Sequence, residues 1–296
     1  MGNKAGEFTI LRPLKAFMGR DNPEVRASLA SYFSGGLAIS CWLYRPPENY
    51  DFSPRGMHPL DMPAPEGGAL VVGHGGVDGV PAHYDYVLRR LAYSGWHIAA
   101  PGYRGEDGSD GEIEFAKGEV DDTLACFEAL TALPGVKAEK TWLLGSSHGA
   151  MVSLLALAKD GGRKIPGAIV LAGVYDLFEW IDWLEESGHF LHDDAHLKAI
   201  YELSDAEKRM RSAKIVADKI EAPVMLFHGE DDTLVPCEMS KSMGDEFART
   251  GKINYSLIIE PGEDHEYIWG PERPAARRMW DAALRFIESN GRIADG

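Results

Sequence analysis

The chain has 296 residues, of which 45% are hydrophobic and 26% charged, and its formal net charge is −16. This length and composition predict a soluble globular protein, and we expect one domain over residues 1–296. The excess of acidic side chains argues against nucleic acid and anionic membrane surfaces as partners.

Residues 1–24 are expected to form a peripheral arm with a short helix. Their opening, MGNKAGEFTILRPLKAF, lacks the apolar core and cleavage site of a secretory signal. No run along the chain approaches the ~20 apolar residues of a membrane span. We therefore expect a cytoplasmic protein without membrane contact, and a homo-oligomer is compatible with these features. Three widely spaced cysteines predict no disulfide framework and are interpreted as small core residues, namely Cys41, Cys126 and Cys237.

Residues 25–47 predict two strands around the turn Ser34-Gly35-Gly36, and residues 46–68 a surface loop rich in proline and glycine. From there on, short apolar strands alternate with helical patterns. Strands are predicted at 68–75, 96–102, 141–145, 167–173, 222–229 and 253–259. The helical stripes are Tyr84/Val87/Leu88/Leu91, Val120/Leu124/Phe127, the run ending at Gly161-Gly162, and Met279/Trp280/Ala283/Leu284/Ile287. This alternation predicts an α/β fold, a mostly parallel sheet of about eight strands with helices on both faces.

Residues 174–214 interrupt the alternation with a long segment of helical tendency, which we expect to be a small cap insertion. Its aromatic residues are Phe178, Trp180, Trp183 and Phe190. We expect at least two of them to pack on the domain below, and any that face a pocket to form an apolar substrate site. Trp180 and Trp183 are the candidates for substrate binding. The stretch HFLHDDAH places His192 and His196 four residues apart, but without an H-E-x-x-H motif it is interpreted as a solvated face. We expect no metal and no cofactor.

The stretch LLGSSHGAM, residues 143–151, is the strongest chemical signal. A strand runs into a helix through a five-residue turn, and a turn that exposes one side chain needs small residues two positions before and after it. Only Ser147 has glycines there, Gly145 and Gly149. The pattern is the G-x-S-x-G nucleophile elbow in its strand–turn–helix context, whereas a structural glycine turn is the bland alternative. We expect Ser147, and not Ser146, to be a nucleophile.

A serine nucleophile requires a base and an orienting acid, which follow it in this order along the chain. His265, in EPGEDHEYIW after the last strand, is the expected base, because the loops that follow parallel strands meet at one edge of the sheet. The other histidines considered are His97, His189, His192 and His196. From the residues alone the acid stays open among Glu230, Asp231, Asp232 and Asp176, while Asp264 is interpreted as a solvated turn residue.

An oxyanion needs two backbone donors held in place before the reaction. One is expected at His148, the residue after the nucleophile, where the helix N-terminus adds a favourable dipole. The second is expected after the strand VVGHGG, at Gly76, since the backbone has to approach the substrate closely there. His74 is interpreted as structural.

In these motifs and their order, the chain from about Ser34 onward resembles the α/β-hydrolases, and among them the catalytic domain of the prolyl oligopeptidase family. The shared segments are RPP, HGG, LAYSGWHIAAPGYRG, GEVDDTLACFEAL, GSSHGAM, APVMLFHGEDDTLVP and PGEDH. The resemblance implies that the acid of HG-x-x-D-x-x-VP, here Asp232, orients His265. It also implies that Tyr103 and Arg104 lie beside the site, Tyr103 as a substrate contact and Arg104 as a brace of its loop.

The peptidases of that family carry an N-terminal β-propeller, and the ~25 residues before the first expected strand are too few for one blade of ~40 residues. We therefore expect a serine hydrolase that cleaves carboxylic esters through an acyl-enzyme intermediate. The alternatives are an oligopeptidase or acylaminoacyl-peptidase, and more remotely an inactive binding or scaffold protein. The expected partner is a small ester or a short peptide substrate.

Overall fold

A computed structural model describes residues 6–16, 24–48, 60, 63–188 and 195–291. The strands are β1 (Thr9–Pro13), β2 (Arg26–Ser34), β3 (Leu37–Arg45), β4 (Ala69–Gly73), β5 (His97–Pro101), β6 (Thr141–Ser146), β7 (Ala168–Leu171), β8 (Val224–Gly229) and β9 (Tyr255–Glu260). The α-helices are α1 (Tyr84–Tyr93), α2 (Gly118–Thr131), α3 (His148–Asp160), α4 (Leu177–Ser187), α5 (Ala195–Tyr201), α6 (Asp205–Met210), α7 (Glu238–Arg249) and α8 (Pro274–Glu288). Short 3-10 helices are η2 (Ala138–Lys140), η3 (Ala213–Lys219) and η4 (Tyr267–Trp269).

Within the described residues, one sheet contains nine strands in the order β1-β2-β3-β5-β4-β6-β7-β8-β9. The pairs from β1 to β5 are antiparallel, and the pairs from β5 through β4 to β9 are parallel. The prediction of a mostly parallel sheet is therefore confirmed, with one strand more than the eight expected. The hairpin of β2 and β3 is also confirmed. Its two turn residues, Gly35 and Gly36, have φ values of +57° and +92°, as a tight hairpin turn requires.

The additional strand is β1, and it corrects the expectation of a helix in the N-terminal arm. Thr9 pairs with Ser31 and Pro13 with Ser28, so β1 extends the antiparallel edge of the sheet. Most of its residues are exposed. A proline is tolerated in an edge strand because its missing N–H faces away from the neighbouring strand.

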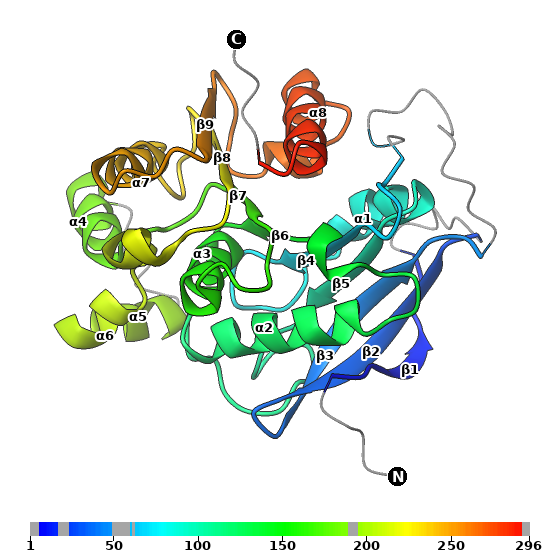
Figure 1. Ribbon diagram of the computed structural model, residues 1–296. Coiled ribbons are helices and arrows are strands. Elements are labelled where there is room, and N and C mark those ends of the chain that lie inside the picture. The colour runs from blue at the N-terminus through cyan, green and yellow to red at the C-terminus, as the bar shows by residue number, and fades with distance from the viewer. Residues whose placement is uncertain (1–5, 17–23, 49–59, 61–62, 189–194, 292–296) are drawn as a thin grey trace.

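Helices cover both faces of the sheet, as the alternating pattern predicted. Phe127 of α2, Met151 of α3 and Phe247 of α7 are buried in one hydrophobic cluster. Leu88 of α1 and Met279 of α8 are buried in a second cluster against the other face. Figure 1 shows α2 and α3 lying across the near face of the sheet.

The strand order reverses at β4, and this positions the site. β4 lies between β5 and β6, and Gly73 at its end is paired with Gly145 of β6. The helix after β4, α1, packs on one face, whereas the helix after β6, α3, packs on the other. The loops after β4 and β6 therefore diverge and leave a crevice beyond the carboxyl ends of the strands, where α/β proteins bind ligands.

The segment between β7 and β8 forms α4, α5 and α6, at the left edge in Figure 1. Leu177, Ile181 and Leu184 bury one side of α4 in the cluster that also holds α3. The Arg209 guanidinium lies over the Phe178 ring, with its Cζ 5.4 Å from the ring centroid. Trp183 is partly buried against the same cluster as α4. Phe190, His189 and His192 lie outside the described residues.

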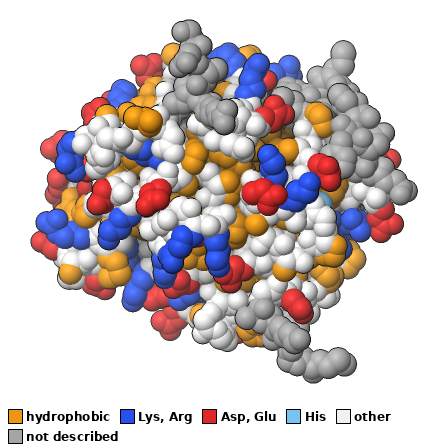
Figure 2. Space-filling model, viewed as in Figure 1, with side chains coloured by type: hydrophobic (Ala, Val, Ile, Leu, Met, Phe, Trp, Pro, Cys, Tyr) orange, Lys and Arg blue, Asp and Glu red, His pale blue; other side chains and the backbone are white. Residues whose placement is uncertain are grey.

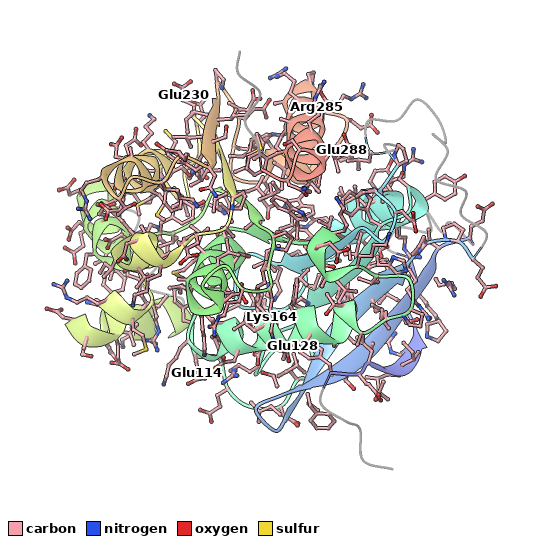
Figure 3. The ribbon with its side chains drawn as sticks, viewed as in Figure 1. Glu114, Glu128, Lys164, Glu230, Arg285 and Glu288 are labelled. Carbon is pink, nitrogen blue, oxygen red and sulfur yellow. The ribbon has the colours of Figure 1, made fainter. Side chains whose placement is uncertain are left out.

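The surface seen in Figure 2 mixes acidic and basic side chains. Figure 3 labels one such pair, Glu128 of α2 and Lys164 after α3, whose side chains lie 2.7 Å apart. In the described part of the chain, no helix has both the length and the apolarity needed to cross a membrane. The three cysteines are buried and unpaired.

Candidate active site

Ser147 occupies a strained turn between β6 and α3. Its backbone has φ 53° and ψ −116°, a region that non-glycine residues rarely adopt. The Ser147 N–H donates to the Leu171 carbonyl at 2.8 Å, which ties the turn to the neighbouring strand β7. Both serines line a cavity, but Ser147 is half-buried, whereas Ser146 before it is buried at the end of β6. This is the backbone geometry of a nucleophile elbow.

The two glycines of the elbow are required by close packing. A Cβ at Gly145 would lie 2.3 Å from the Gly149 carbonyl oxygen and 2.5 Å from Ser153 Oγ. A Cβ at Gly149 would lie 2.3 Å from the carbonyl of Gly73 in β4. These distances are far inside van der Waals contact, so any side chain at either position would push the helix away from the sheet.

His265 and Asp232 are brought into direct contact from two loops. Asp232 follows β8 and His265 follows β9, and these strands are parallel neighbours, so their loops leave the same edge of the sheet. His265 Nδ1 lies 2.6 Å from Asp232 Oδ2. The Asp232 carboxylate has no exposed surface, and the His265 side chain is 11% exposed. His265 lines the same cavity as Ser147.

The Asp232 carboxylate is held by several donors. Its Oδ1 accepts from the backbone N–H groups of Leu234 and Val235, each at 2.9 Å. Its Oδ2 contacts His228 Nε2 at 3.1 Å in addition to His265. Burial by itself would raise the pKa of Asp232, but the hydrogen bonds with His228 and His265 outweigh it and hold that pKa well below the usual range. The acid is therefore a fixed anion at neutral pH.

The other acids considered from the sequence have different surroundings. Asp176 caps α4, accepting the Phe178 N–H at 2.9 Å. Asp264 is exposed and accepts from Arg273 Nη2 at 2.8 Å. Glu230 and Asp231 are exposed, and Figure 3 shows Glu230 at the upper edge of the molecule, beside β8 and β9.

Gly76 and His148 also meet at the cavity. His148 is the first residue of α3, and Gly76 has φ +70° in the loop after β4. The His148 side chain is buried, and its Nδ1 lies 3.1 Å from the Gly76 carbonyl oxygen, so this nitrogen donates. Burial lowers the pKa of His148 to about 3, and the ring is therefore neutral. The imidazole fixes the spacing between the two loops whose backbone N–H groups are the expected oxyanion donors.

A second buried group supports the loop after β4. His74 is fully buried, its Nδ1 contacts the Gly75 carbonyl at 3.0 Å, and its Nε2 lies 3.7 Å from Glu106 Oε2. Glu106 in turn accepts the Gly79 N–H at 2.6 Å. Burial lowers the pKa of His74 to about 4 and raises that of Glu106 to about 8. Both side chains thus hold the loop as neutral groups at neutral pH.

Tyr103 and Arg104 do not lie where a substrate would touch them. Tyr103 is fully buried, with its ring 4.7 Å from the His74 ring, so its expected role in substrate binding is corrected to packing beneath the loop. A φ of +38° turns its backbone at this point. Arg104 contacts both oxygens of Asp122 and donates to Glu114 at 2.6 Å, which braces its own loop.

The cavity at Ser147 has a volume of about 370 Å³ and a largely apolar wall. Trp180 lines it and donates through Nε1 to the Leu234 carbonyl at 3.3 Å. Trp183 is absent from the described lining residues, because it packs against the core at the side of α4. The apolar residues that sequence reasoning missed are Val77, Tyr84, Phe115, Val174, Leu234 and Val235.

The described cavity wall contains two acidic side chains, Asp78 and Glu266, and two histidines, His148 and His265. Glu266 is exposed and lies 3.6 Å from His83 Nε2. His97, considered as a base, is the first residue of β5, away from the cavity. Among the residues that the structure describes, no cluster of three metal-ligating side chains occurs.

The chain matches a known family over most of its length. The sequence profile of the prolyl oligopeptidase family matches residues 83–290. The chain is 25% identical over 228 residues to the "Uncharacterized peptidase YtmA" of Bacillus subtilis (strain 168), covering 77% of this chain and 82% of that protein. It is 23% identical over 170 residues to the isoprenylcysteine alpha-carbonyl methylesterase ICME of Arabidopsis thaliana, covering 51% of this chain and 39% of that protein.

Solved structures share the fold. The acylaminoacyl peptidase of Pyrococcus horikoshii superposes with a TM-score of 0.69 at 17% identity, covering 93% of this chain and 43% of that chain. A puromycin hydrolase gives a TM-score of 0.67 at 21% identity, covering 92% of this chain and 40% of that chain. The chain thus spans about two fifths of the length of these two proteins. The expectation of an α/β-hydrolase fold is confirmed.

Proposed function

Because the chain belongs to the prolyl oligopeptidase family and is a serine hydrolase, we propose that it cleaves carboxylic esters with Ser147, His265 and Asp232 as its catalytic triad. The observation that carries the proposal is the 2.6 Å contact between His265 Nδ1 and the buried Asp232 carboxylate. The histidine of this pair shares a cavity with the serine of a strained elbow. Few arrangements other than a triad would bring these groups together at the mouth of a parallel sheet.

In the proposed reaction, Asp232 holds the proton of His265 on Nδ1, which leaves Nε2 as the free base. Ser147 Oγ attacks the acyl carbonyl while its proton passes to His265 Nε2. The carbonyl oxygen becomes an oxyanion and accepts from the backbone N–H groups of His148 and Gly76. His265 then protonates the leaving alcohol, and the ester bond breaks to give the acyl-enzyme. A water molecule then attacks the acyl-enzyme carbonyl while its proton passes to His265 Nε2. His265 returns this proton to Ser147 Oγ as the acyl–oxygen bond breaks, and the carboxylic acid is released.

The size and the apolar wall of the cavity favour substrates with short to medium acyl groups. Its volume of about 370 Å³ lies at the lower end of the range for ligand sites, and its wall is largely apolar. We propose that α4 acts as a small cap through Trp180, and that the acids Asp78 and Glu266 disfavour anionic substrates by like-charge repulsion. An ester has a better leaving group than an amide, so its cleavage depends less on accurate protonation of the leaving group.

The second candidate is a peptidase, supported by the peptidases among the relatives and neighbours. Comparing kcat/KM for p-nitrophenyl butyrate with that for acylated and free aminoacyl p-nitroanilides separates the two. We expect the ester to be cleaved much faster than every anilide. Faster turnover of any anilide would replace the esterase proposal by the peptidase one.

The nucleophile is tested by labelling with an organophosphonate and peptide mapping. We expect one label per chain, on Ser147, and Ser147→Ala should lose about 10⁴- to 10⁶-fold in kcat. Ser146→Ala is the matched control and should keep much of the activity, since Ser146 lines the same cavity but is buried at the end of β6 and lacks the positive φ of Ser147. A label on Ser146 would refute the assignment. Failure of the intact chain to react at all would favour the remote alternative, an inactive binding protein.

A further inference from the structure

We propose that His228 is a positioning residue for the triad acid, and that it sets the charge which Asp232 presents to His265. The inference rests on the proposed function, because it assigns a role through Asp232. His228 has no exposed surface and is the second-last residue of β8, the strand that the loop with Asp232 directly follows. It touches neither the cavity nor, by this proposal, the substrate.

The contacts of His228 define which of its nitrogens carries a proton. Nε2 faces two acceptors, Asp232 Oδ2 at 3.1 Å and the Val235 carbonyl oxygen at 2.9 Å. A nitrogen between a carboxylate and a carbonyl has to be the donor. Nδ1 lies 2.7 Å from the hydroxyl of Ser240, which supplies the matching partner on the other side of the ring. Ser240 is in α7 and is also fully buried.

The two histidines therefore share one oxygen. Oδ2 of Asp232 contacts His265 at 2.6 Å and His228 at 3.1 Å, while Oδ1 is occupied by backbone N–H groups. A donor from His228 keeps the carboxylate from rotating. It also draws negative charge away from His265, since each hydrogen bond to an anion disperses part of its charge. Less negative charge beside His265 favours the neutral imidazole, which is the form that acts as a base.

The other titratable groups near Ser240, His228, Asp232 and His265 are the same in the wild type and in the His228 variants. Tyr175, before α4, lies against Ser240, and burial raises the pKa of its hydroxyl. Asp264 and Glu266 flank His265 in its own loop, Asp78 faces the cavity from the loop after β4, and Tyr84 faces it from α1. A shift in the pH profile of a His228 variant is therefore attributable to the lost contact with Asp232.

The experiment uses two amide variants that differ by one methylene. In His228→Gln the amide nitrogen reaches the place of Nε2 and still donates to Asp232. In His228→Asn the shorter side chain reaches only the place of Nδ1, beside Ser240. We measure kcat/KM for p-nitrophenyl butyrate from pH 5 to 9, together with the melting temperature. Ser240→Ala is the control for a lost buried contact that leaves the Asp232 oxygen in place.

For His228→Asn we expect the midpoint of the acidic limb to move upward by about 0.5 to 1 pH unit, and kcat/KM on the plateau to fall about tenfold. His228→Gln should stay within about 0.2 unit of the wild-type midpoint, well below that shift. Ser240→Ala should lower the melting temperature without moving the midpoint. Equal midpoints for the Asn and Gln variants, or an equal shift in Ser240→Ala, would overturn the inference. If His228→Asn does not fold, a Gln midpoint more than half a unit from the wild type overturns it.

Asp232→Asn separates this inference from the proposed function. If that variant keeps most of its activity, Asp232 is not the triad acid and the proposed triad fails. If Asp232→Asn is inactive while His228→Asn keeps the wild-type midpoint, the triad stands and only the role of His228 is refuted.

Discussion

The packing of the elbow glycine Gly145 is the part of the site that a single methyl group tests most sharply. In Gly145→Ala the added Cβ would lie 2.3 Å from the Gly149 carbonyl oxygen and 2.5 Å from Ser153 Oγ. The carbonyl belongs to the first turn of α3 and already accepts from Ser153 at 2.7 Å, so neither atom can move alone. Restoring normal contacts requires a separation of β6 and α3 of about 1 Å, and overpacking of this kind costs about 3 kcal/mol.

The same displacement moves Ser147, because that residue joins β6 to α3. A misplacement of about 1 Å at a reacting atom costs about 100-fold in rate. We therefore expect Gly145→Ala to lose about 3 kcal/mol in urea denaturation and about 100-fold in kcat/KM for p-nitrophenyl butyrate. Gly161→Ala, at the other end of α3, is the matched control. Gly161 has φ +61°, and its nearest neighbour for a Cβ lies 3.9 Å away.

Gly161→Ala should therefore cost only backbone strain, about 1 kcal/mol, with kcat/KM unchanged. Wild-type kcat/KM in Gly145→Ala, or a loss of stability no larger than that of Gly161→Ala, would show that the elbow tolerates a side chain at residue 145. Active-site titration with the organophosphonate distinguishes a misplaced serine from a smaller fraction of folded enzyme.

Two further predictions concern the buried acids. Asp232→Asn should lower kcat about 10⁴-fold, because the amide favours the wrong tautomer of His265. Asp176→Asn should change kcat only a few-fold, because asparagine also caps helices. A large loss of kcat in Asp176→Asn would contradict this. Burial raises the pKa of Glu106 to about 8, so the folded state holds a proton that the unfolded state loses above its pKa of about 4.5. The stability that this group contributes is full below the unfolded pKa and is lost as the pH rises through the folded value. The free energy of unfolding of Glu106→Gln should thus rise relative to that of the wild type by about 1.4 kcal/mol per pH unit between pH 5 and 8, measured by urea denaturation. A difference that does not depend on pH would refute the protonated Glu106.

The sequence predicted best those features for which local packing allows only one residue type. Glycines two residues before and after Ser147 are required by close contacts between β6, α3 and β4, and this spacing is the general pattern of a nucleophile elbow. From the residues alone the acid stayed open among three consecutive acids and Asp176, and the family resemblance selected Asp232. Only the fold places the Asp232 carboxylate inside, against His265, and leaves Glu230 and Asp231 outside.

The features that the sequence did not predict depend on partners distant in the chain. β1 is a strand because the backbone of β2 is available beside it, although its own residues bury little. Phe115 and Leu234 line the cavity from loops, and no periodic pattern marks a loop residue as a wall. Tyr103 follows a strand end, as site residues do, but its positive φ turns the side chain inward.

Ser147, the proposed nucleophile, and the expected oxyanion donors form one packing unit. Gly149 presses against the carbonyl of Gly73, a Cβ at Gly75 would lie 3.0 Å from Ser147 Cβ, and the His148 ring contacts the Gly76 carbonyl at 3.1 Å. These three contacts join the loop after β4 to the elbow after β6, at the point where the strand order reverses. The spacing of the donors is therefore set by packing before any substrate binds, which is the condition for stabilising charge that develops only in the transition state.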